Sequence, residues 1–62
     1  MKNNKAFIRR YGGYKWECKF PDSDLFYRLM TEFDHKTATQ VIAKLEALPA
    51  NKGIKFFQNN AA

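Results

Sequence analysis

Covalent or acid–base catalysis would need a nucleophile placed beside a base, and this sequence holds few candidates. It contains one serine, one cysteine and one histidine: Ser23, Cys18 and His35. Ser23 and His35 fall in separate expected turns, and Cys18 falls on an expected core face with no helix N-terminus beside it to activate the thiol. We therefore expect no active site and no enzyme activity, a buried and inert Cys18, and a solvent-exposed His35.

The sequence is equally poor in metal ligands. A lone histidine cannot complete a zinc site. The stretch Asp22-Ser23-Asp24 is similar to the start of a calcium loop, but the glycine and the distal glutamate of such a loop are missing. Turn formation after Pro21 explains these residues, and we expect neither a metal nor a cofactor.

The sequence does favour binding to polyanions, because the chain is rich in cations. It holds 11 Lys and Arg against 6 Asp and Glu, which gives a formal net charge of +5, and residues 1–20 carry six of these cations with one acid. Such a charge distribution predicts one positive side, which speeds encounters with polyanions. Solubility alone is the alternative explanation, since net charges of ~2–8 are ordinary for small domains.

The clearest element that could position these cations is a β-hairpin. Two alternating, aromatic-rich segments, 5–11 and 14–20, flank Gly12-Gly13, a doublet that suits a two-residue turn with positive φ. This turn predicts that Tyr11 pairs with Tyr14 and that Arg9 faces Trp16 as a cation–π pair. The expected core face holds Phe7, Tyr11, Tyr14, Trp16, Cys18 and Phe20, and the open face holds Ile8, Arg10, Lys15, Glu17 and Lys19. A one-residue slip would exchange the faces of one strand.

Residues 25–33 fit two interpretations. As a helix capped by Ser23 or Asp24, the segment has an apolar stripe. As a strand, which we favour because a lone hairpin needs a third strand, it turns one set of residues to the core and another outward. The expected core set is Leu25, Tyr27, Leu29 and Phe33, and the outward set is Phe26, Arg28, Met30 and Glu32.

A helix over residues 35–48 is the firmest prediction. Asp34 is a good N-cap, and Pro49 ends the helix. Its expected apolar face holds Ala38, Val41, Ile42, Leu45 and Leu48. Beyond it, residues 54–57 are short and β-prone, and Phe56 and Phe57 cannot both point inward from a strand.

Together these elements predict one α+β domain over residues 1–62, a small antiparallel three-stranded sheet packed against one C-terminal helix in βββα order. A short fourth strand is an added option. The chain has room for one domain only. With apolar runs of two or three residues and no signal-peptide pattern, we expect no membrane partner and a cytoplasmic location.

The sheet face that the helix leaves open is the predicted binding site. Cations there would contact phosphates, and interleaved apolar side chains would contact bases. The candidates for nucleic-acid binding are Arg9, Arg10, Lys15, Lys19 and Arg28, and the candidates for contact with a partner protein are Phe26, Met30 and Phe57. Four phosphate contacts would give a log–log salt slope of about −3.6. That is weak for one copy, so we expect accessory use or a homodimer.

Residues 9–48 resemble the small arm-binding N-terminal domains of tyrosine-type phage and transposon integrases. Gly13-Tyr14-Lys15-Trp16-Glu17 resembles their second strand, and Phe33-Asp34-His35-Lys36-Thr37-Ala38 is similar to their Phe-Asp-Thr-Lys-x-x-Ala helix start. The resemblance implies a three-stranded sheet that reads the DNA major groove, with Arg10, Lys15, Lys19 and Arg28 facing the DNA. The turn at 21–24 lacks the customary Gly-x-Arg, and the chain has no room for a recombinase catalytic domain.

The strand–strand–Phe-Pro-Asp–helix outline also resembles small antitoxins with a partial ribonuclease-H-like fold, which act by binding a protein. Two functions therefore stay open. The first is a nucleic-acid-binding accessory or regulatory module, encoded by a phage or mobile element, with double-stranded DNA favoured over RNA. The second is a small inhibitor or antitoxin-like protein that masks a host protein.

Overall fold

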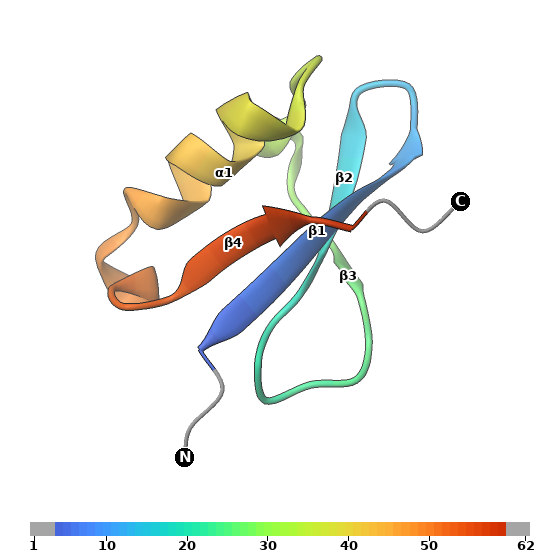
Figure 1. Ribbon diagram of the computed structural model, residues 1–62. Coiled ribbons are helices and arrows are strands. Elements are labelled where there is room, and N and C mark those ends of the chain that lie inside the picture. The colour runs from blue at the N-terminus through green and yellow to red at the C-terminus, as the bar shows by residue number, and fades with distance from the viewer. Residues whose placement is uncertain (1–3, 60–62) are drawn as a thin grey trace.

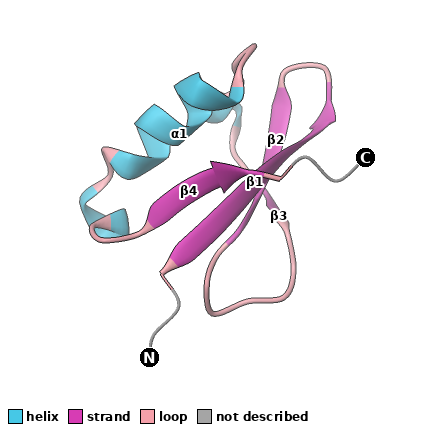
Figure 2. Ribbon diagram, viewed as in Figure 1, coloured by secondary structure: helices cyan, strands magenta, loops and turns pink. Residues whose placement is uncertain are grey.

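In the part of the chain that the structure describes, a four-stranded sheet has one helix across one of its faces (Figures 1 and 2). The structure is a computed structural model that describes residues 4–59. The strands are β1 (Lys5–Gly12), β2 (Lys15–Lys19), β3 (Tyr27–Arg28) and β4 (Lys55–Gln58), in the spatial order β3-β2-β1-β4. The helix is α1 (Ala38–Glu46), and two short 3₁₀ turns, η1 (Thr31–Phe33) and η2 (Pro49–Asn51), flank it.

The sheet is mixed, which corrects the expected three-stranded antiparallel arrangement. β1 and β2 are antiparallel, as are β2 and β3, but β4 lies parallel to β1. Parallel neighbours need a long crossover connection, commonly a helix, and α1 supplies it between β3 and β4. The α+β class with one helix is confirmed, and the optional fourth strand is present at the edge beside β1.

The hairpin register differs from the prediction by the one-residue slip that reverses β1. Ile8 lies opposite Cys18 and Arg10 opposite Trp16, and the pairing is irregular between Arg10 and Gly12. Gly12 pairs with Lys15, so the two loop residues are Gly13 and Tyr14, and of the two doublet glycines only Gly13 has positive φ, at 52°. A turn with positive φ at its first central residue meets this geometry.

The slip places Ala6 and Ile8 in the core in place of Phe7 and Tyr11. The largest fully buried side chains are Trp16, Ile8 and Cys18 of the sheet and Leu45 and Val41 of the helix. The same cluster contains Ala6, Phe33, Ala38 and Phe56. Trp16 Nε1 donates to the His35 carbonyl oxygen at 2.8 Å. The predicted inward set on β2 is thereby confirmed for Trp16 and Cys18, whereas the predicted core position of Tyr14 is wrong because it lies exposed in the turn.

The helix is shorter at both ends than the predicted 35–48. It begins at Ala38, and its N-cap is Thr37, whose Oγ1 accepts from the Gln40 N–H at 3.4 Å. Asp34 is extended, and its carboxylate forms an ion pair with Lys15 Nζ of β2 at 3.1 Å. It therefore does not cap the helix. At the other end Leu48 is extended, as expected before Pro49, and its side chain is exposed.

In the segment 25–33 the strand interpretation holds for two residues only, Tyr27 and Arg28. The chain then turns into η1, which ends with the buried Phe33, and the helical interpretation is wrong. Leu25 and Tyr27 are exposed although they were expected to face the core. Among the strands, α1 contacts mainly β4 and β1, which lie toward the edge of the sheet away from β3.

Candidate functional site

The slip gives the uncovered side of the sheet a different set of residues from the one predicted. Since neighbouring side chains alternate between faces, the side opposite α1 carries alternate residues of β1, β2 and β4, together with Arg28 of β3 and Phe26 just before it. Lys15 alternates with them on β2 but is left out, because its ammonium group pairs with Asp34. We call this surface the ring–cation face. It consists of Lys5, Phe7, Arg9, Tyr11, Glu17, Lys19, Phe26, Arg28, Lys55 and Phe57.

One end of the ring–cation face is a pair of phenylalanine rings. β4 lies beside β1 with Phe57 opposite Phe7, and the two ring centroids are 5.9 Å apart. Lys19 of β2 places its Nζ 5.6 Å from the Phe7 centroid. Phe57 remains 42% exposed, so this cluster presents an aromatic surface with an ammonium group beside it.

The centre of the face is a carboxylate shared by two guanidinium groups. Glu17 Oε1 accepts from Arg9 Nε at 2.9 Å, and Glu17 Oε2 lies 3.8 Å from Arg28 Nε. The Arg9 guanidinium lies 3.9 Å from the Phe26 ring centroid, and that of Arg28 lies 4.8 Å from the Tyr11 centroid. Two ring–guanidinium contacts, Phe26 with Arg9 and Tyr11 with Arg28, therefore meet at the Glu17 carboxylate.

The ring–cation face keeps a positive charge despite Glu17. Among the described residues on it, the cations are Lys5, Arg9, Lys19, Arg28 and Lys55, and the one acid is Glu17. The Glu17 side chain is only 14% exposed, whereas that of Arg28 is 73% exposed. A polyanion approaching this surface would therefore meet the ammonium and guanidinium groups before the carboxylate.

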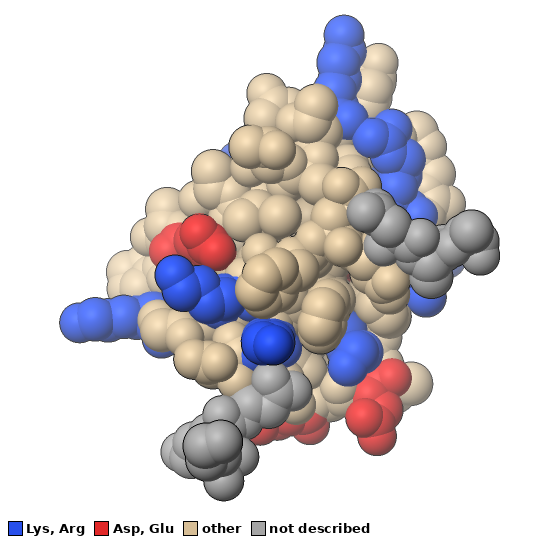
Figure 3. All heavy atoms as spheres, in the orientation of Figure 1, with Lys and Arg blue, Asp and Glu red and all other residues tan. Residues whose placement is uncertain are grey.

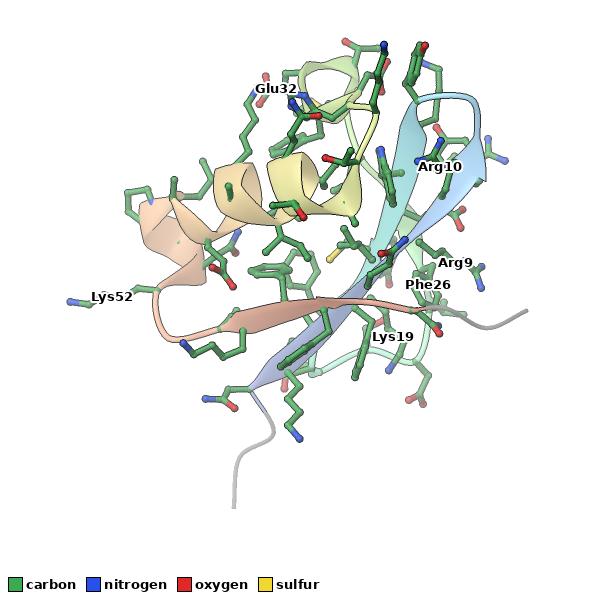
Figure 4. All side chains as sticks on the ribbon, turned by 45° about the horizontal axis from the view of Figure 1, so that its top comes forward. Arg9, Arg10, Lys19, Phe26, Glu32 and Lys52 are labelled. Carbon is green, nitrogen blue, oxygen red and sulfur yellow. The ribbon has the colours of Figure 1, made fainter. Side chains whose placement is uncertain are left out.

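The structure brings together three of the five cations predicted to bind nucleic acid. Lys19 and Arg28 lie on the open face as expected, and Arg9 joins them, although the sequence placed it opposite Trp16. Figure 4 shows Arg9 beside Phe26 with Lys19 nearby, and Arg10 apart from them near the hairpin end.

Arg10 and Lys15 have other partners, which corrects their predicted place in an open cluster. The guanidinium of Arg10 lies 4.8 Å from the Trp16 ring centroid and donates to the carbonyl oxygens of Gly13 at 3.1 Å and Lys36 at 2.6 Å. It closes the core at the hairpin end. The ammonium group of Lys15 is held by the Asp34 carboxylate. The cation–π partner of Trp16 is thus Arg10 and not the predicted Arg9.

The candidates for protein contact divide in the same way. Phe57 is on the ring–cation face, and Phe26 lies there beneath the Arg9 guanidinium. As predicted, one of the two neighbouring phenylalanines is buried, Phe56, and the other is exposed. Met30 comes after β3 ends, is 67% exposed, and takes part in none of the ring and ion-pair contacts described above.

Figure 3 shows one face of the molecule, on which lysine and arginine side chains lie in separate groups with uncharged surface between them. The expected single positive side is therefore not seen in this view. On the ring–cation face, three cations lie over aromatic rings of the same face: Arg9, Lys19 and Arg28.

Sequence reasoning missed Phe7, Tyr11, Lys5 and Lys55 as members of the site. A Gly12-Gly13 loop puts Phe7 and Tyr11 on the same face as Trp16, whereas the observed loop is Gly13-Tyr14. The signal that could have found them is that Ala6 and Ile8 are also a complete core pair. Nothing in the sequence indicated that β4 would align with β1 and place Phe57 against Phe7.

Cys18 and His35 lie outside the ring–cation face. Burial raises the pKa of the Cys18 thiol to about 11, and the predicted burial of Cys18 is confirmed. His35 was expected in solvent but is half-buried, with its Nε2 atom buried and not hydrogen-bonded. Over residues 4–59, no group of three His, Cys, Asp or Glu side chains could hold a metal ion.

The helices give no sign of a membrane-spanning segment. α1 has nine residues, whereas a membrane crossing takes about 20 apolar residues. Within the described part of the chain, no helix meets that requirement.

No family model, curated protein or solved structure matches this chain. The resemblances to integrase arm-binding domains and to antitoxins therefore stay predictions. The function has to be argued from the ring–cation face itself.

Proposed function

We propose that this chain is a binding module that contacts a nucleic acid through the ring–cation face. The observation that carries the proposal is the contact of aromatic rings with guanidinium and ammonium groups on an uncovered sheet face. Nucleic acids offer a complement to both, because phosphates attract cations and bases present apolar faces and edges to rings. The proposal includes no catalytic step.

The charges on the ring–cation face support a salt-dependent contact with phosphates. Its five cations outnumber its acid, and Glu17 is already paired with two arginines. If four of the cations contact phosphates, log K should fall with log salt with a slope of about −3.6 on duplex DNA or about −2.8 on a single strand. Affinity at physiological salt would then be modest, so an accessory or regulatory role fits better than autonomous binding.

A double substitution tests this function directly. Lys19→Gln with Arg28→Gln removes two cations of the ring–cation face, and Lys36→Gln with Lys52→Gln removes two exposed cations from other parts of the chain. Lys52 lies far from Arg9 and Lys19 in Figure 4. Binding to labelled oligonucleotides would be measured by fluorescence anisotropy between about 50 and 200 mM salt.

The proposal expects the first pair to weaken binding and reduce the salt slope by about 2, since each lost phosphate contact removes about 1. The control pair should reduce affinity far less, through long-range attraction alone. Equal losses in the two double variants would reject the ring–cation face as the site. Failure of the unaltered protein to bind any oligonucleotide would reject the function.

A second function, masking of a host protein, is favoured by a different surface. Leu25, Tyr27 and Met30 are large apolar side chains near the β3 edge, and all three are more than half exposed. Tyrosine and methionine are enriched at protein interfaces. An affinity for a protein that is indifferent to salt, and that is lost in Met30→Ser but kept in the Lys19 and Arg28 double variant, would favour this function over the first.

A further inference from the structure

We infer that the nucleic acid bound by the ring–cation face is a single strand, held by stacking of its bases on Phe57 and Tyr11. The inference rests on the proposed function and gives it a substrate class. Three features of the face carry it: the exposure of its rings, the distance between them, and the partners that its central arginine already has.

The first feature is the exposure of two rings on an uncovered sheet. Phe57 is 42% exposed and Tyr11 is 37% exposed. Phe57 is supported from the side by Phe7. In a duplex the faces of the bases are already stacked on one another, and only base edges and phosphates are reachable. A single strand can turn its base faces toward rings, so it fits the exposed aromatic surface better.

The second feature is the spacing of the two ring platforms. Phe7, which marks the Phe57 end, is four residues before Tyr11 on β1. At about 3.3 Å per residue the two platforms are roughly 13 Å apart. Arg9 lies between them on β1, Lys19 is opposite Phe7 on β2, and Arg28 is level with Arg9 two strands away. A strand laid along β1 could place one base on each platform and its intervening phosphates beside these cations, which implies a site near the lower end of the ~4–16 nucleotides of single-strand sites.

The third feature is the arginine at the centre. Sequence readout in a duplex uses arginine most often as a bidentate donor to guanine. Arg9 Nε already donates to Glu17, and the Arg9 guanidinium is stacked on Phe26. Arg28 is close to the same carboxylate and lies over Tyr11, so a base at this platform would stack on the Arg28–Tyr11 pair. Guanidinium planes held in this way suit stacking with an unpaired base better than insertion into a groove.

The test compares single and double strands on ring variants. The probes are a labelled oligothymidylate of about 12 nucleotides, its RNA counterpart oligouridylate, and the oligothymidylate annealed to oligodeoxyadenylate. The variants are Phe57→Leu and Tyr11→Leu, which keep an apolar side chain and remove the ring. Tyr27→Leu is the control, because Tyr27 is an exposed ring that lies next to Cys18 and so points to the other side of the sheet. Thermal unfolding followed by circular dichroism shows that each variant is folded.

We expect the single strands to bind at least about 10-fold more tightly than the duplex at equal salt. Each of Phe57→Leu and Tyr11→Leu should weaken single-strand binding at least about 5-fold, the lower limit for loss of one stacked base, and Tyr27→Leu should not. The oligothymidylate and oligouridylate affinities then show whether DNA or RNA is preferred.

The outcomes separate this inference from the function beneath it. Equal or tighter duplex binding that depends on Lys19 and Arg28 would overturn the single-strand inference and leave the nucleic-acid function standing. Single-strand binding that Phe57→Leu and Tyr11→Leu leave at the level of Tyr27→Leu would overturn the stacking. Absence of binding to all three probes would overturn both.

Discussion

Arg10 should matter for stability and not for binding. The substitution Arg10→Met keeps much of the aliphatic stem and removes the guanidinium. That group donates to the Lys36 and Gly13 carbonyl oxygens and lies 4.8 Å from the Trp16 ring centroid. Two hydrogen bonds at about 1 kcal/mol each, with a cation–π contact of about 0.5–1 kcal/mol, set an upper range of about 2.5–3 kcal/mol. Because Arg10 is exposed, water replaces part of this, and we expect a loss of about 2 kcal/mol.

Urea unfolding followed by Trp16 fluorescence measures this loss, and thermal unfolding gives a second estimate. In a domain of this size, 1 kcal/mol corresponds to about 4–8 °C in Tm, so Arg10→Met should melt about 8–16 °C lower. Arg28→Met is the matched control, since the Arg28 side chain is 73% exposed, and it should cost less than about 1 kcal/mol. A stability change within about 0.5 kcal/mol for Arg10→Met, together with loss of nucleic-acid binding, would refute the assignment of Arg10 to the hairpin end.

Two further predictions concern the turn and the buried thiol. Gly13→Ala should destabilise the protein by about 1–2 kcal/mol because φ at Gly13 is 52°, whereas Gly12→Ala should cost less, and equal losses in urea unfolding would contradict the observed turn. Burial raises the pKa of Cys18 to about 11 from a usual value near 9, so the folded protein holds this proton more tightly than the unfolded chain, and stability should fall between about pH 9 and 11. A Cys18→Ala variant should lose that part of the pH dependence, and iodoacetamide should alkylate Cys18 slowly until urea unfolds the chain.

The turn of the hairpin could be predicted from the sequence, but its register could not. Gly12-Gly13 predicted a tight turn, and the turn is there, but either glycine can adopt positive φ. The choice between them decides which face of β1 is buried. Each alternative had apolar residues to bury, Phe7 and Tyr11 in one and Ala6 and Ile8 in the other. Hydrophobic alternation therefore could not select the register.

The helix was predictable on its apolar side and less so at its ends. Val41 and Leu45 are buried as expected, and Pro49 limits the helix as expected. Asp34 and Thr37 are both good N-caps, and local propensity does not choose between them. In the structure Thr37 caps the helix, and Asp34 pairs instead with Lys15, a residue distant in sequence.

The candidate site was predictable only in outline. An open sheet face with Lys19, Phe26 and Arg28 was expected and is present. Phe7 and Tyr11 lie on this face because of the slip of β1, and Phe57 lies there because β4 aligns parallel to β1. Both depend on how strands distant in sequence meet, which periodicity along one segment does not encode.

The most direct test of the ring–cation face is a map of where an oligonucleotide touches the protein. Amide chemical shifts of labelled protein would be followed by NMR during titration with oligothymidylate. Binding at the ring–cation face predicts the largest changes in β1, in Lys19 and in Phe57, with small changes along α1. Changes concentrated on α1, or none at saturating oligonucleotide, would contradict it.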